Sequence, residues 1–117
     1  MKKTTITAMI AILVIFSSFQ TRFLPTSLRI TVIDNLGNFV ENAEVTIYTS
    51  EEDYRNGTNP VSEKQMTDDK GRVKFKDLEP KSYFIDARKG DQNNDGEGVK
   101  TAVLKEGRMN KVNTVIE

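Results

Sequence analysis

The chain has 117 residues with no cysteine, histidine or tryptophan, and its 17 basic residues balance its 17 acidic residues. This length allows one domain at most beside any segment removed during processing. The composition excludes a disulfide framework, a thiolate zinc site and chemistry that depends on histidine. The mixed charge gives no electrostatic reason to expect nucleic acid or an anionic membrane as a partner.

Residues 1–19 predict a secretory signal peptide. Lys2 and Lys3 form a charged start, residues 8–16 form an uninterrupted apolar run, and small side chains follow near the expected cleavage point. The apolar run is shorter than the roughly 20 residues that span a bilayer. An uncleaved anchor that starts near Thr4 is the alternative. The pattern favours export, with no membrane span after cleavage.

Two further regions follow the leader, a linker at residues 20–26 and a single domain at residues 27–117. Cleavage removes two lysines and no acidic residue, so the mature chain is weakly acidic. In the domain, apolar and polar side chains alternate in short stretches between turns, which predicts β-strands with one wet face. The expected strands cover residues 28–34, 44–49, 63–67, 73–76, 83–87, 99–104 and 109–116.

The polar stretches 51–62 and 88–98 are expected to be loops, and no amphipathic helix is expected after the leader. About seven short strands joined by turns predict an all-β fold, an antiparallel β-sandwich. Residues 67–87 organise it as turn, strand, corner and strand. Gly71 suits the turn because it accepts a positive φ. The expected centre of the core consists of Phe75, Leu78, Tyr83 and Ile85, with Val32 and Ile47 facing them.

Two motifs carry a resemblance to a known family. Residues 34–45 follow the pattern Asp-x-x-Gly-x-x-Val-x-x-Ala-x-Val, and residues 67–83 follow Thr-Asp-x-x-Gly-x-Val-x-Phe-x-x-Leu-x-Pro-x-x-Tyr. The chain resembles the carboxypeptidase regulatory-like domain, a transthyretin-like (prealbumin-like) β-sandwich found in bacterial surface and envelope proteins. The resemblance spans residues 28–117 and implies a fold more strongly than a function. Lys81 stands where the family has a corner glycine, and the polar loop after Gly90 is also unusual.

That loop matches the first half of a calcium-binding loop. Asp91, Asn93, Asp95 and Glu97 alternate with other residues around Gly96, so oxygen-bearing side chains could wrap a hard cation. The position where a closing glutamate would complete an EF-hand is an alanine, and no helices are expected on either side. The sequence leaves two readings open, a partial calcium site and a solvated hairpin turn.

Other candidate sites are less specific. The acidic cluster 51–53 predicts a solvated loop tip, with partner or cation binding as the alternative. Tyr48 points opposite Ile47, which either exposes it as a binding anchor or packs it beneath the following loop. A lysine–asparagine crosslink lacks its donor, because the first strand offers Arg29 where a lysine would be needed, although Asn113 lies in the last strand.

An enzymatic role is not expected. The transthyretin-like fold includes a hydrolase of hydroxyisourate whose chemistry depends on histidine, and this chain has none. We expect an exported, non-catalytic binding or accessory domain of the bacterial cell envelope, which acts through loops or a sheet edge. The alternative is a small structural subunit of a larger outer-membrane or envelope complex. The expected partner is an envelope protein or glycan, the expected location is the periplasm or the cell surface, and no cofactor other than calcium is expected.

Overall fold

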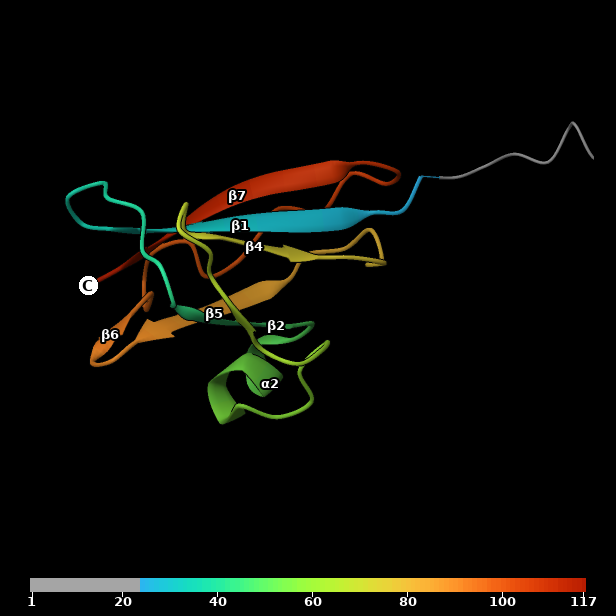
Figure 1. The fold of residues 1–117 in the computed structure, drawn as a ribbon. Helices are drawn as coiled ribbons and strands as arrows, with labels where there is room; N and C mark the ends of the chain where they lie inside the picture. Colours follow the sequence, from blue (N-terminus) through green and yellow to red (C-terminus); the bar gives the residue numbers. More distant parts are fainter. Residues whose placement is uncertain (1–23) are drawn as a thin grey trace, which may run out of the picture.

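The computed structural model describes residues 24–117, and the predicted signal peptide at residues 1–19 lies outside them. This part of the chain forms two β-sheets packed face to face and one short helix (Figure 1). Its elements are β1 (Ser27–Asp34), β2 (Glu44–Tyr48), α2 (Glu51–Asn56), β3 (Gln65–Met66), β4 (Arg72–Phe75), β5 (Phe84–Lys89), β6 (Gln92–Asn93) and β7 (Met109–Ile116). No helix within residues 24–117 has both the length and the apolar character needed to span a bilayer.

The strand order is β4-β1-β7 in one sheet and β3-β2-β5-β6 in the other. The predicted all-β, two-sheet architecture is therefore confirmed. The expectation of purely antiparallel pairing is wrong for one pair, because β1 and β7 run parallel from Ser27 opposite Met109 to Asp34 opposite Ile116. Parallel neighbours require a crossover connection rather than a hairpin. Here the long connection from β1 to β7 contains all four strands of the second sheet as well as β4 (Figure 1).

The hydrophobic core lies between the two sheets. The inward side chains of β1, β2, β4 and β5 alternate with outward polar ones, as strands with one buried face require. The predicted core centre is confirmed for Phe75, Tyr83, Ile85, Val32 and Ile47, which are all nearly or fully buried. Leu78 is only partly buried and packs against the edge of the core.

Two predictions between residues 88 and 104, one strand and one loop, are wrong. Residues 99–104 form no regular strand, although they run beside β5, where the Thr101 amide donates to the Tyr83 carbonyl at 2.9 Å. In the expected loop, β6 pairs with the end of β5 through Arg88 opposite Asn93 and Lys89 opposite Gln92. The chain therefore forms a short hairpin, β5–β6, within the stretch whose polar composition predicted a loop.

The loop predicted at residues 51–62 contains the helix α2. Ser50 caps its N-terminus, where the Ser50 hydroxyl accepts a hydrogen bond from the Asp53 amide at 3.1 Å. Acidic residues occupy the first turn, which suits the helix dipole, and Gly57 ends the helix with a φ of 66°. The acidic cluster 51–53 is thus a helix start rather than a loop tip.

The organising stretch 67–87 folds as predicted at its turn. Gly71 has a φ of +70°, and a Cβ there would lie 2.5 Å from the Val32 carbonyl oxygen, so only glycine fits. The corner that follows has no glycine, and Asp77 takes the left-handed conformation with a φ of 54°. The Tyr83 hydroxyl secures this corner, because it accepts from the Glu79 amide and donates to the Glu79 carbonyl, both at 3.0 Å.

Candidate functional site

Two of the four predicted calcium residues use their side chains within the protein. The Asn93 side-chain oxygen accepts from the Asp95 amide at 3.0 Å, and the Asp95 carboxylate accepts from the Tyr54 hydroxyl at 3.1 Å. Asp91 lies in the exposed turn between β5 and β6, and Glu97 is exposed beyond it. Within residues 24–117 no group of three or more acidic residues is arranged to hold a metal ion.

Calcium binding by residues 91–97 stays a prediction. Thermal melting in about millimolar calcium and in chelator tests it for the wild type and for Asp91→Ala combined with Asp95→Ala. A calcium-dependent rise in Tm that the double variant abolishes would establish the site.

Asn94 is a structural residue of this loop that the sequence analysis missed. It is fully buried, and its side-chain amide donates to the Ile85 carbonyl and to the Thr114 hydroxyl, both at 2.9 Å. Its side-chain oxygen accepts from the Ala87 amide at 3.0 Å. The amide group thus behaves like one more peptide unit beside β5 and ties the loop to β7. In the sequence of a polar stretch, an asparagine that will be buried looks the same as one that lies in an exposed turn.

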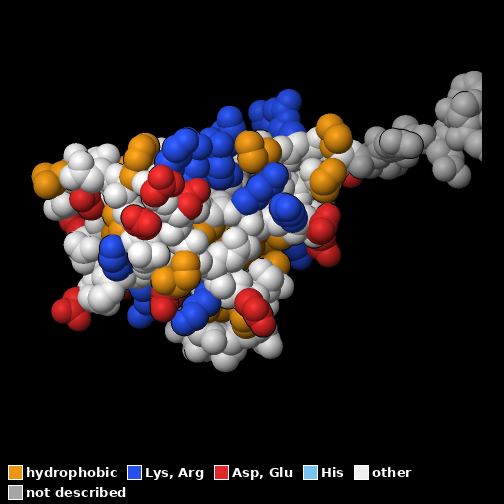
Figure 2. Space-filling model, viewed as in Figure 1, with side chains coloured by type: hydrophobic (Ala, Val, Ile, Leu, Met, Phe, Trp, Pro, Cys, Tyr) orange, Lys and Arg blue, Asp and Glu red, His pale blue; other side chains and the backbone are white. Residues whose placement is uncertain are grey.

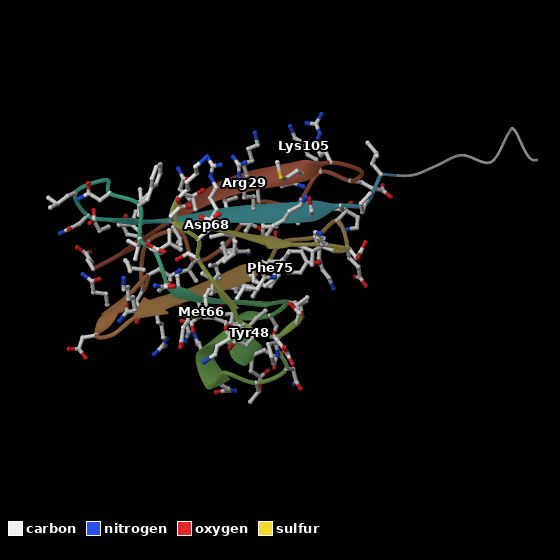
Figure 3. All side chains as sticks on the ribbon, in the orientation of Figure 1. Arg29, Tyr48, Met66, Asp68, Phe75 and Lys105 are labelled. Carbon is white, nitrogen blue, oxygen red and sulfur yellow. The ribbon has the colours of Figure 1, made fainter. Side chains whose placement is uncertain are left out.

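An aromatic recess covers one end of the second sheet. The Tyr54 ring of α2 lies 6.2 Å from Tyr48 and 6.2 Å from Phe84, measured between ring centroids. Tyr48 is only 6% exposed and lies where α2 meets β2 (Figure 3), so the packed alternative for this residue holds. Burial and the hydrogen bond to Asp95 raise the pKa of Tyr54 to about 12. A cavity of about 390 Å³ opens beside Tyr54.

A second depression lies between the β1–β2 connection and the β5–β6 turn, with a volume of about 800 Å³. Phe39, 59% exposed, gives it an apolar wall, and Asp91 lies on the opposite side. Asp34 also lines it, but this carboxylate accepts hydrogen bonds from the amides of Leu36 and Asn38 at 2.9 Å each. Because those donors stabilise the charged form, the pKa of Asp34 is lowered. The carboxylate is thus used to close its own turn.

The long edge of the first sheet is the third candidate. β7 has eight residues and pairs with β1 alone in the described part of the chain. The Ser27 amide donates to the Arg108 carbonyl at 3.1 Å, so Arg108 directs its backbone groups toward β1. Because successive residues of a strand direct these groups to alternate sides, the amide and carbonyl of Lys111 point away from β1. No backbone hydrogen bond within residues 24–117 joins Lys111 to another segment.

The other sheet edges are closed or short. On β4, the Lys74 carbonyl accepts from the Gln65 side chain at 2.9 Å, and the Arg72 carbonyl accepts from the Asp68 amide at 3.1 Å. The edge strands β3 and β6 of the second sheet have two residues each. Gly98 packs against the Asn113 carbonyl, so within residues 24–117 the open part of the β7 edge lies around Lys111.

Comparisons with known proteins bear on the fold. No family model matches the chain, and no curated protein matches it either. A solved structure of the Bacillus anthracis TIE protein is similar at a TM-score of 0.54 and 25% identity, over 80% of this chain and 17% of that chain. A streptococcal ancillary pilin is similar at a TM-score of 0.54 and 14% identity, over 82% of this chain and 33% of that chain.

These likenesses identify the class of the molecule as a β-rich, two-sheet domain. This chain spans a third or less of the length of both proteins. A chlorocatechol 1,2-dioxygenase from Pseudomonas putida is similar at a TM-score of 0.48 and 18% identity, over 85% of this chain and 63% of that chain. That likeness is too weak to bear on activity.

Proposed function

We propose that the chain is an exported, non-catalytic binding domain of the bacterial cell envelope, of the carboxypeptidase regulatory-like type. The signal-like pattern of residues 1–19 supports export to the periplasm or the cell surface. The motifs in residues 34–45 and 67–83 support the family. The open edge of β7 carries the binding role, and the partner is an envelope protein that offers an extended segment.

An open sheet edge exposes a protein to unwanted strand pairing. A row of unpaired amides and carbonyls is a template for pairing with any extended chain, and proteins usually shorten or cover such edges. The remaining edges within residues 24–117 are treated in that way, and Gly98 packs against β7 at Asn113, whereas the β7 edge around Lys111 stays open. An added strand would satisfy the outward groups of Lys111 and extend the first sheet, which is a recurring mode of peptide recognition.

A pair of variants at Lys111 tests this proposal. Lys111→Pro removes the outward amide without touching the ladder to β1, because proline is tolerated at a sheet edge. Lys111→Gln removes the same charge but keeps the amide. Covalent crosslinking in the native host, followed by mass spectrometry of the crosslinked product, should give one partner with the wild type and with Lys111→Gln. That partner should be lost with Lys111→Pro.

Equal thermal stability of the two variants would show that the fold is intact. A partner that survives Lys111→Pro would contradict binding at the β7 edge, and a partner lost already with Lys111→Gln would show that charge, rather than strand addition, is recognised. The alternative function is that of a structural subunit, which would stay bound in a larger envelope complex instead of binding its partner reversibly. In that case the native protein would elute in mild detergent as one stable large species instead of a free monomer.

A further inference from the structure

The outer face of the first sheet carries a concentrated positive charge. Arg29 of β1 lies opposite Lys74 of β4 on one side and opposite Lys111 of β7 on the other. Arg72 lies two residues along β4 on the same face. Adjacent strands are about 4.8 Å apart, so the three-residue row spans about 10 Å, and Arg72 lies about 7 Å from it. We name these four residues the cationic face.

The outward positions of the first sheet hold no acidic residue, and the Lys74 and Lys111 side chains are exposed there. The outward positions of the three strands hold Arg29, Thr31, Ile33, Arg72, Lys74, Met109, Lys111, Asn113 and Val115. In Figure 2, Lys and Arg side chains gather over β1 and β7 with Asp and Glu side chains beside them, whereas α2 lies against the other sheet, at the bottom of the view in Figure 1. Figure 3 shows Arg29 pointing away from the core, with Lys105 projecting on the same side.

No ion pair within residues 24–117 uses a residue of the cationic face. The Nε atoms of Arg29 and Arg72 are buried without a hydrogen-bond partner. Asp68, in the turn before β4, is the nearest counter-charge: its carboxylate accepts from the amides of Arg72 and Lys70 at 2.9 Å each, and these bonds together with the charge of Arg72 lower the pKa of Asp68. One carboxylate offsets only part of four like charges within about 12 Å, so an external anion would relieve the remaining repulsion.

We propose that the cationic face binds a linear polymer that carries phosphate groups along its length. Arginine presents a planar fork of donors that matches phosphate, and a lysine supplies a point charge beside it. The flat face holds its charges in a row, which suits successive phosphates of one extended chain. This site is distinct from the backbone edge of β7, and only Lys111 contributes to both.

The charge of the whole domain favours a thin polymer over a membrane. Residues 24–117 contain 14 basic and 17 acidic residues, a net charge of −3. A broad anionic surface such as a bilayer would repel much of this molecule within a Debye length of roughly 8–10 Å. A single polymer chain touches the cationic face alone. Nucleic acid fits less well, because the outward positions of this face offer no aromatic side chain on which bases could stack.

The test uses the full exported protein and labelled inorganic polyphosphate, with fluorescence anisotropy as the readout. With four phosphate contacts at about 0.7 each, the logarithm of the binding constant should fall with the logarithm of salt at a slope of about −3. Binding should therefore weaken about 50-fold when salt rises from about 50 to about 200 mM. The double variant Arg29→Gln with Lys111→Gln should bind at least about tenfold more weakly, with a slope of about −1.4.

The matched control is Arg55→Gln with Lys64→Gln, which removes the same charge from exposed ion pairs beside the other sheet. It should keep the wild-type slope and affinity within about twofold. Equal weakening of both double variants would overturn the proposal, since net charge alone would then explain binding. Absence of polyphosphate binding by the wild type would overturn it as well.

Two further arms separate the possible sources of phosphate. Tighter wild-type binding to anionic phospholipid vesicles, or to single-stranded DNA, than to polyphosphate would overturn the proposal in favour of a membrane or a nucleic acid. If the first double variant fails to fold, amide NMR of the wild type decides. Polyphosphate should then shift the signals of Arg29, Arg72, Lys74 and Lys111, and shifts confined to other elements would refute the site. The two proposals stay distinguishable, because Lys111→Pro and Lys111→Gln remove the same charge, so only the difference between them reports on the backbone amide of β7.

Discussion

Replacing Asn94 with alanine should strongly destabilise the domain. The change removes the acceptor of the Ala87 amide and the donor to the Ile85 carbonyl, two backbone groups in the interior of β5. A buried polar group left without a partner costs about 1–3 kcal/mol, so two such groups, allowing for partial relaxation, cost about 3 kcal/mol. The Thr114 hydroxyl keeps a second partner, the Glu97 carbonyl, and adds little. This loss is a large fraction of the stability of a small domain.

Equilibrium unfolding in urea measures the effect. With an m-value of about 1.5 kcal/mol per M, the midpoint should fall by about 2 M. The neighbouring Asn93→Ala is the control, because Asn93 is only partly buried and its side chain accepts one exposed hydrogen bond from the Asp95 amide. It should shift the midpoint by less than about 0.5 M. If the two variants shift the midpoint equally, the buried amide of Asn94 does not hold the loop to the sheets.

Three other changes test the fold. Phe75→Ala should lower the free energy of unfolding in urea by about 3–5 kcal/mol because it leaves a cavity in the core, whereas Lys74→Ala on the outer face should lower it by less than about 0.5 kcal/mol. Equal losses would mean that the strand register is wrong. Tyr83→Phe should cost about 1–2 kcal/mol, since it removes the hydroxyl that bonds both backbone groups of Glu79, and an unchanged midpoint would refute that role. The folded-state pKa of Tyr54 is raised from 10.0 to about 12, so its contribution is complete below pH 10 and is lost as pH rises towards 12. Tyr54→Phe should therefore lose less stability than the wild type between these pH values.

The sequence predicts the strands whose two faces differ most. Val73 and Phe75 alternate with charged residues, and burial of one face leaves only one register. The helix α2 was missed because it has six residues and buries none of them, although Ser50 and Gly57 mark both of its ends. The stretch 99–104 has the composition of a strand, but its conformation depends on how it packs beside β5, and the local sequence does not encode this contact.

The candidate sites were harder to predict than the fold. The cationic face unites Arg29, Lys74 and Lys111, which are far apart in the chain, and only the strand order brings them together. The open edge of β7 likewise depends on its parallel position beside β1. In residues 91–97 the sequence draws attention to the alternating acidic positions, whereas the residue that the domain depends on structurally is Asn94 between them.

The parallel pairing of β1 and β7 also has a mechanical consequence. The chain enters the sheet at Ser27 and leaves it at Ile116, at opposite ends of two adjacent strands that share eight register pairs (Figure 1). Tension applied along the chain would slide the two strands past each other, so the hydrogen bonds between them would be loaded together instead of opening one after another. Forced unfolding is governed by the barrier to this first rupture rather than by equilibrium stability. A domain connected in this way resists stretching between the points where its chain enters and leaves.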